Sequence, residues 1–101
     1  MYRSVFGFIL GVALVFAATL VKAESGMASF YGGIGHHGEM TCAHRTRAFG
    51  TMVTVTYAGR SIQCRVNDRG PFIRSRIIDV STSAARALGM MDAGVVRVSI
   101  E

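Results

Sequence analysis

The chain has 101 residues, a hydrophobic content of 50% and a formal net charge of +5. That length allows one small domain with a thin core and excludes a large multidomain enzyme. The basic residues form no run and the net charge is modest, and both features, with the export predicted below, count against nucleic acid as a partner.

Residues 1–23 have the pattern of a secretory signal peptide. Arg3 supplies a positive start, residues 5–21 are apolar and uncharged, and Val-Lys-Ala before Glu24 has small residues at both positions that a signal peptidase needs. An uncleaved membrane anchor is the alternative, because the apolar run approaches the length that spans a bilayer. No cysteine stands at the cleavage point, so a lipid anchor is not expected. We expect an exported protein, periplasmic or secreted, with no stable membrane span after cleavage.

The expected mature domain is 24–101. Of the 11 basic and 6 acidic residues, only Arg3 and Lys22 precede it, which leaves 9 arginines and a net charge of +3. A guanidinium group donates several hydrogen bonds at once, so an arginine-rich exported surface suits anionic or polyhydroxylated polymers.

Two cysteines, Cys42 and Cys64, fall within this domain. In an oxidising compartment a single disulfide between them is expected. Closing a loop of that length would stabilise so small a domain by roughly 3 kcal/mol. Two unpaired thiols or a role as metal ligands are the alternatives.

Short segments of alternating apolar and polar residues follow residue 23 and are typical of half-buried strands. In chain order the expected strands are 26–31, 51–57, 61–67, 77–80 and 95–101. Ala-Gly-Arg forms a hairpin turn between the second and the third. Asp-Arg-Gly-Pro at 68–71 makes a tight turn before the fourth. Ser81 has the position of an N-cap for a helix over 82–88, which Gly89 ends.

This number of strands, five or six with one helix in under eighty residues, favours an all-β fold. A closed barrel is expected, because a sandwich of this size would leave long strand edges unpaired. A small open sheet covered by the helix is the alternative.

Three segments carry a recognisable pattern in order: Cys-Ala-His-Arg-Thr-Arg-Ala-Phe-Gly-Thr at 42–51, Val-Asn-Asp-Arg-Gly-Pro-Phe at 66–72 and Arg-Ile-Ile-Asp-Val-Ser at 76–81. Together with an opening strand at 26–32, the pattern resembles the RlpA (rare lipoprotein A) family of bacterial lytic transglycosylases over essentially all of 24–101. The resemblance implies a six-stranded double-psi β-barrel with one or two short helices, related to expansins. It also implies cleavage of stem-peptide-free peptidoglycan glycan strands that leaves 1,6-anhydro-muramyl ends. We expect a monomer that uses no cofactor.

The resemblance also implies site residues. The family's catalytic aspartate falls on Asp68, its essential histidine on His44 and the aspartate of its second strand motif on Asp79, for which we expect a structural role near Ser81. Family members carry a longer segment before the histidine, with a glutamate implicated in function. Here that segment is shorter, and Glu39 is the candidate to replace this glutamate.

A lytic transglycosylase needs only one acid–base group, because the C6 hydroxyl of the sugar itself attacks C1. We expect Asp68 to be that group, and a cap of its own turn is the alternative role. His44 would orient the acid or bind the sugar. The alternative is a structural histidine whose hydrogen bonds are made within the barrel wall. Glu39 is the third expected catalytic residue.

Four further residues are expected to bind substrate. Arg45 and Arg69 could hold carboxylate or acetamido groups, although solvated arginines are common. Tyr31 and Phe72 could stack on sugar faces, although aromatic residues in so small a domain are usually part of the core.

The sequence His36-His37-Gly38-Glu39, followed by Cys42 and His44, invites a metal-binding interpretation. The spacing fits no standard zinc template, so no metal is expected, and the adjacent histidines are placed in solvent or at the rim of the groove. The leading prediction is therefore an exported lytic transglycosylase. A non-catalytic glycan-binding or wall-loosening module in the manner of expansins is the alternative, and an exported metal-binding protein is a third.

Overall fold

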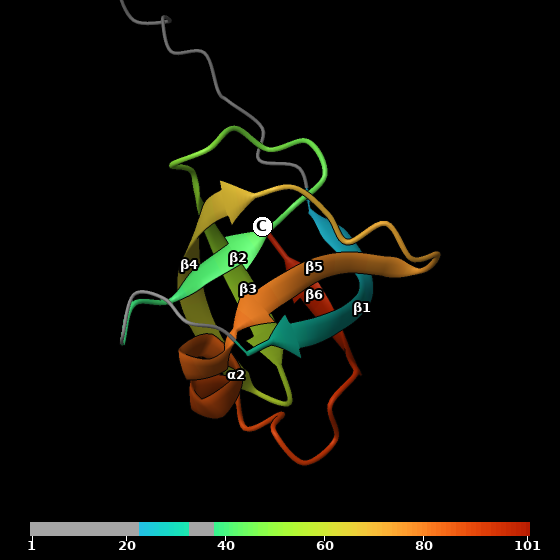
Figure 1. Ribbon diagram of the computed structural model, residues 1–101. Helices are drawn as coiled ribbons and strands as arrows, with labels where there is room; N and C mark the ends of the chain where they lie inside the picture. Colours follow the sequence, from blue (N-terminus) through green and yellow to red (C-terminus); the bar gives the residue numbers. More distant parts are fainter. Residues whose placement is uncertain (1–22, 33–37) are drawn as a thin grey trace, which may run out of the picture.

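We describe residues 23–32 and 38–101 in a computed structural model of the chain (Figure 1). The expected signal peptide, apart from its last residue, and the pair His36 and His37 lie outside the described residues.

The described residues form six strands and one helix. These are β1 (Glu24–Tyr31), β2 (Thr41–Ala43), β3 (Met52–Tyr57), β4 (Arg60–Asp68), β5 (Arg76–Ser81), α2 (Thr82–Leu88) and β6 (Val96–Ile100). The strands close into a barrel in the order β1-β5-β2-β4-β3-β6, which confirms the closed barrel over the open sheet. The β1–β5 and β2–β4 pairs are parallel and the other pairs are antiparallel.

The five expected strands and the helix lie within two residues of their expected bounds, but β2 was missed. It has only three residues, all buried, so it offers no alternation of apolar and polar side chains from which a strand could be recognised. The predicted hairpin turn between β3 and β4 is confirmed. Ala58 and Gly59 both have positive φ, as a two-residue turn of this kind requires.

Alternate residues of the strands point into the barrel and form its core. The largest fully buried side chains include Ile78, Ile100, Val53, Val55 and Val66, and each stabilises the fold by about 1.5–3 kcal/mol. The expected disulfide joins Cys42 of β2 to Cys64 of β4, both without exposed surface. It therefore fastens the shortest strand to the longest.

Helix α2 begins and ends as expected. The Ser81 hydroxyl accepts the Ala84 N–H at the N-terminus, and Gly89 takes a left-handed φ of 79° after the last turn. The helix buries Ala84, Ala85 and Leu88 and packs against β4, β5 and β1.

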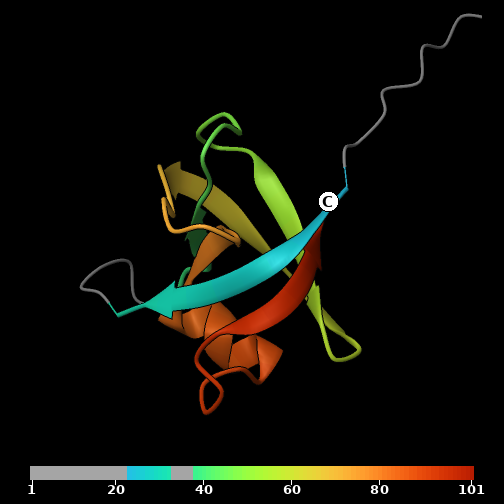
Figure 2. The same cartoon turned by 90° about the vertical axis from the view of Figure 1, so that its right-hand side faces the viewer.

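The strand directions give the barrel two different ends. Parallel β2 and β4 finish at the same end, where antiparallel β5 begins, and β1 begins there too because it is parallel to β5. We call this the loop end, because the loops 44–51 and 69–75 lie there (Figure 1). The opposite side, with α2 and the 89–95 loop, is called the helix end. Figure 2 shows β1 and β6 side by side, where they close the barrel.

Candidate active site

A row of residues crosses the outer face of four neighbouring strands. Ser29 pairs with Asp79, and Asp79 pairs with Ala43. A register irregularity between β2 and β4, with Asn67 as the extra residue, brings Asp68 opposite Ala43. Directly opposed residues share a face of the sheet. Asp68 and Asp79 are thus on the same outer face, two strand spacings or about 10 Å apart.

Asp68 lies at the last position of β4 and is exposed to solvent. One of its oxygens, Oδ1, accepts the Arg69 N–H at 2.8 Å, so the carboxylate caps its own turn, as the alternative prediction had it. Its main-chain oxygen accepts the His44 N–H at 3.1 Å. No other hydrogen bond to the carboxylate is made by the residues that the structure describes, which leaves Oδ2 accessible to a ligand.

His44 is buried, with 4% of its surface exposed, and both of its ring nitrogens are used. Nδ1 accepts the N–H groups of Thr46 and Arg47, each at 3.1 Å. Because a main-chain N–H can only donate, the ring hydrogen is on Nε2, which donates to Glu24 Oε1 at 3.0 Å. The ring therefore bonds to the 44–51 loop and to Glu24 and not to the Asp68 carboxylate. This agrees with the alternative prediction of a histidine whose hydrogen bonds are satisfied within the protein.

Glu24 was not predicted as a site residue. Its Oε1 accepts from Arg47 Nη2 at 3.3 Å as well as from His44. Partial burial is the largest single influence and raises the pKa of Glu24, but the hydrogen bonds from His44 and Arg47 and the charge of Arg47 together lower it. Glu24 is thus a carboxylate at neutral pH. No sequence pattern links it to His44, twenty residues away, and it stands beside the expected cleavage point.

Arg45 was expected to bind substrate, but its guanidinium group is engaged within the protein. Nε donates to Pro71 O at 2.7 Å, and Nη2 donates to Ile73 O at 3.2 Å and Arg76 O at 2.6 Å. The three carbonyl oxygens span the loop that follows Asp68. Arg45 therefore joins the two loops of the loop end.

Arg69 makes the reciprocal connection. Its Nη1 donates to the carbonyl oxygens of His44 at 3.1 Å and Arg47 at 2.7 Å, and its guanidinium carbon lies 4.3 Å from the centre of the Phe49 ring. Such a cation–π contact adds to the hold on the loop. Like Arg45, Arg69 serves the loops that surround Asp68.

Exposed apolar side chains lie on both loops of the loop end. Phe72, which was expected to meet sugar faces, is 78% exposed and so is not a core residue. Ile73 is 55% exposed and Phe49 is 59% exposed. The sequence analysis did not single out Phe49, although it lies within the motif that contains His44.

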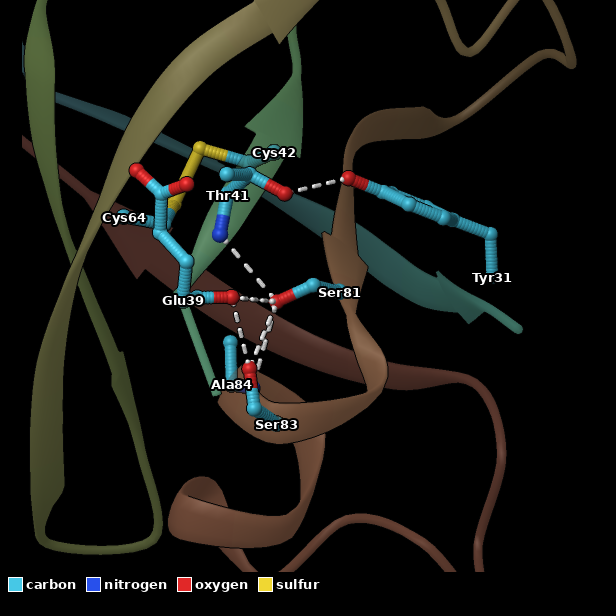
Figure 3. Close-up of a disulfide and its surroundings, with 8 residues drawn as sticks. All are labelled: Tyr31, Glu39, Thr41, Cys42, Cys64, Ser81, Ser83 and Ala84. Carbon is cyan, nitrogen blue, oxygen red and sulfur yellow. Dashed lines mark hydrogen bonds between the residues drawn. A yellow bond between two sulfur atoms is a disulfide. The ribbon is translucent and has the colours of Figure 1, made fainter. Parts of the chain in front are cut away.

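Two expected site residues lie toward the helix end instead. Glu39 accepts two hydrogen bonds from Arg65, at 2.9 and 2.6 Å, and Arg65 lies three residues before Asp68 on β4, or about 10 Å along the strand. Tyr31 shares a hydrogen bond of 2.8 Å with the Thr41 hydroxyl (Figure 3). No hydrogen bond or ion pair among the described residues joins Glu39 or Tyr31 to Asp68 or His44.

Asp79 has a structural partner, but not the expected one. Its Oδ1 accepts the Ser29 hydroxyl, whereas a main-chain amide near Ser81 was expected. The register of β1 and β5 is the reason, since it sets Ser29 directly opposite Asp79. The amide at the start of α2 is bonded by the Ser81 hydroxyl instead.

Beside the loops, Glu24, His44, Arg45, Thr46 and Ile77 line a small cavity of about 140 Å³. Pockets that enclose organic ligands usually measure about 300–1,000 Å³, so this cavity is smaller than such pockets. The exposed surface around Asp68 is therefore the better candidate for a polymer.

Residues 23–32 and 38–101 contain no group of three or more metal-ligating side chains placed to hold an ion. Cys42 is used in the disulfide. Within the same ranges, no helix has the length and apolar character needed to cross a membrane.

The closed barrel with two parallel strand pairs defines the chain as a double-psi β-barrel protein. It superimposes on an expansin of Clavibacter michiganensis with a TM-score of 0.68 and 24% identity, over 79% of this chain and 50% of the expansin. It also superimposes on the Streptomyces papain inhibitor with a TM-score of 0.63 and 23% identity, over 79% and 93% of the two chains. At these identities the likeness concerns the fold alone.

Residues 23–100 match the lytic transglycolase family, and the chain belongs to this family. A relative from Nostoc, named "Probable endolytic peptidoglycan transglycosylase RlpA", is 48% identical over 100 residues, which cover 84% of this chain and 27% of the relative. The "Endolytic peptidoglycan transglycosylase RlpA" of Neisseria meningitidis is 44% identical over 91 residues, which cover 77% and 38%. The chain thus spans about a third of the length of these relatives. The predicted family and fold are confirmed, and the disulfide together with a cell-wall family indicates an extracytoplasmic protein.

Proposed function

We propose that this chain is an exported, monomeric peptidoglycan lytic transglycosylase that cuts stem-free glycan strands internally and leaves 1,6-anhydro-muramyl ends. Asp68 would be its acid and base. The observation that carries the proposal is the exposed Asp68 carboxylate, fixed through Oδ1 and the main chain on an end of the barrel that two cross-linked loops surround. The names of the relatives support the reaction class.

In this reaction Asp68 gives a proton to the glycosidic oxygen as the C1–O bond breaks. The resulting carboxylate then takes the proton of the C6 hydroxyl while that oxygen bonds to C1, which regenerates the acid and uses no water. Because the nucleophile belongs to the same sugar, one carboxylate is enough. Asp79 is the other acid of the row. Its carboxylate already accepts the Ser29 hydroxyl, which supports a mechanism that uses Asp68 alone.

The glycan would lie over the exposed apolar residues beside Asp68. Phe72 and Phe49 offer ring surface on two different loops, and Ile73 extends it. Aromatic faces of this kind suit the apolar faces of sugar rings. Arg45, Arg69 and His44 would shape this surface by holding the loops, and Glu39 and Tyr31 would take no part in the chemistry.

The test is mass spectrometry of amidase-treated glycan strands after incubation with the wild-type protein, Asp68→Asn or Asp92→Asn. Asp92 is an exposed acid on the 89–95 loop and serves as the matched control. We expect anhydro-muramyl products from the wild type and the control, and a rate roughly 10²–10⁴-fold lower from Asp68→Asn.

A second candidate function is a non-catalytic glycan-binding or wall-loosening module. The observation in its favour is Glu39, whose carboxylate accepts from Arg65 rather than lying beside Asp68. Strands that are bound by all three proteins but cut by none would reject the enzyme and support this module.

A further inference from the structure

We propose that Glu24 is a positioning residue, which fixes the place of Asp68 by holding His44 across the loop end of the barrel. The effect on catalysis rests on the function proposed above. Among the described residues the Glu24 carboxylate bonds to His44 and Arg47 and not to Asp68, so its action on Asp68 is indirect.

The first step is the contact between Glu24 and His44. The His44 ring has one hydrogen to give, on Nε2, because Nδ1 already accepts two main-chain N–H groups. Glu24 Oε1 is the acceptor, at 3.0 Å. Since His44 is buried, removing this acceptor would leave an unpaired buried donor and favour rotation of the ring or a change of tautomer.

The second step is the anchoring of Glu24 itself. Its main chain pairs with Ile100 of β6 at the closure of the barrel, and its carboxylate also accepts from Arg47. The pKa of Glu24 is lowered despite partial burial, which keeps this acceptor charged at neutral pH. The His44 ring is therefore held against a strand and not against a mobile surface group.

The third step leads from His44 to Asp68. The His44 N–H donates to Asp68 O at 3.1 Å, and the His44 carbonyl oxygen accepts from Arg69 at 3.1 Å. A displacement of His44 consequently moves both residues of the Asp68–Arg69 turn. In the barrel, β1 is adjacent to β5 and β6, whereas β4 is adjacent to β2 and β3. The Glu24–His44 bond and the bond from the His44 N–H to Asp68 O together thus link β1 to β4, two strands that do not pair with each other.

Two substitutions and one control test this assignment. Glu24→Ala removes the acceptor, Glu24→Gln keeps an acceptor oxygen of the same reach without the charge, and Asp92→Ala removes an exposed acid at the helix end. All are made in a protein that keeps Ala23, so that the substituted glutamine is not the first residue and cannot cyclise. The measurements are kcat and KM on stem-free glycan strands and the ¹⁵N NMR shifts of the His44 ring.

We expect Glu24→Ala to lower kcat by about 10- to 100-fold with little change in KM, as a small misplacement of a catalytic group does. Its His44 ring should lose the signature of a hydrogen fixed on Nε2. Glu24→Gln should keep that signature and recover kcat to within several-fold of the wild type. Asp92→Ala should match the wild type in both measurements.

Two results would overturn the proposal. One is a Glu24→Ala protein with the kcat and ring shifts of the wild type, and the other is a Glu24→Gln protein as impaired as Glu24→Ala. If the wild type itself cuts no strands, the proposed function fails, but the NMR comparison still decides the role of Glu24. Unchanged main-chain shifts at His44, Asp68 and Arg69 in Glu24→Ala would then refute it.

Discussion

Apart from the Arg65–Glu39 ion pair, the described residues hold the helix end of the barrel with neutral hydrogen bonds and the loop end mainly with charged ones. At the helix end, the hydroxyls of Tyr31, Thr41, Ser81 and Ser83 bond to one another and to main-chain groups (Figure 3). At the loop end, charged side chains reach across loops, and Arg45 and Arg69 donate to five carbonyl oxygens between them.

This difference in bonding suggests that the helix end contributes mainly to stability and the loop end mainly to catalysis. Neutral hydroxyls near their own strands fix the helix and cost little conformational freedom, whereas long arginine side chains can hold loops that have no strand partner. The exposed acid lies where the loops are held. We therefore expect changes at the helix end to lower stability with activity preserved, and changes at the loop end to do the reverse.

Breaking the disulfide should have the largest effect, because it joins the two strands that lead to His44 and Asp68. Replacing both Cys42 and Cys64 by Ala should lower the free energy of unfolding by about 3 kcal/mol. Urea unfolding of the double variant, and of the wild type with and without reductant, measures this loss. Equal midpoints for the oxidised and reduced wild type would contradict it.

Ser81→Ala tests the helix end alone. Its hydroxyl caps α2 and accepts the Thr41 N–H, so its loss should cost about 2 kcal/mol. For a domain of this size that lowers Tm by roughly 8–16 °C. Below the transition kcat should be unchanged. Ser83→Ala is the control and should lower Tm less. A large fall in kcat for Ser81→Ala would contradict the expectation that the helix end affects stability and not activity.

Arg45→Lys tests the loop end alone. An ammonium group cannot reach three carbonyl oxygens spread over six residues, so the loop after Asp68 loses its support. We expect kcat to fall by about 10-fold, the effect of a modest misplacement of Asp68. Tm should change little, because the side chain is exposed and water replaces the lost bonds. Full activity with a lowered Tm would reverse the assignment.

The smallest effect concerns pH. The folded pKa of Glu24 is lowered, so its contribution to stability is complete above the unfolded value of about 4.3 and disappears as pH falls through the folded value. The Tm difference between the wild type and Glu24→Gln should therefore be constant from neutral pH to about pH 5 and shrink below about pH 4. A difference that grows on acidification would show the opposite shift.

Much of the fold followed from the sequence, because its signals are local. Alternation placed five strands, Ser81 and Gly89 bounded the helix, and two cysteines in a chain expected to be exported gave the disulfide. Asp68 was assigned from the resemblance, and its place at the exposed end of a strand agrees with the turn chemistry of Asp-Arg-Gly-Pro. Such features depend on neighbours within a few residues.

What the sequence could not supply depends on closure of the barrel. The partners of Arg45, Arg69 and Glu24 lie twenty or more residues away, and they meet only when β1, β2 and β4 reach the same end. Glu39 was assigned as the candidate to replace the family's glutamate before His44, yet β2 lies between Glu39 and His44 and carries Glu39 away from the loop end. Missing β2, with its three residues, concealed that separation.

The most direct test of the account is to run the reaction on stem-free glycan strands in H₂¹⁸O and weigh the new ends by mass spectrometry. If the C6 hydroxyl attacks C1 under Asp68 catalysis, the anhydro ends carry no label, and Asp68→Asn yields few of them. Labelled reducing ends would mean that water is the nucleophile, and the one-carboxylate mechanism assigned to Asp68 would be wrong.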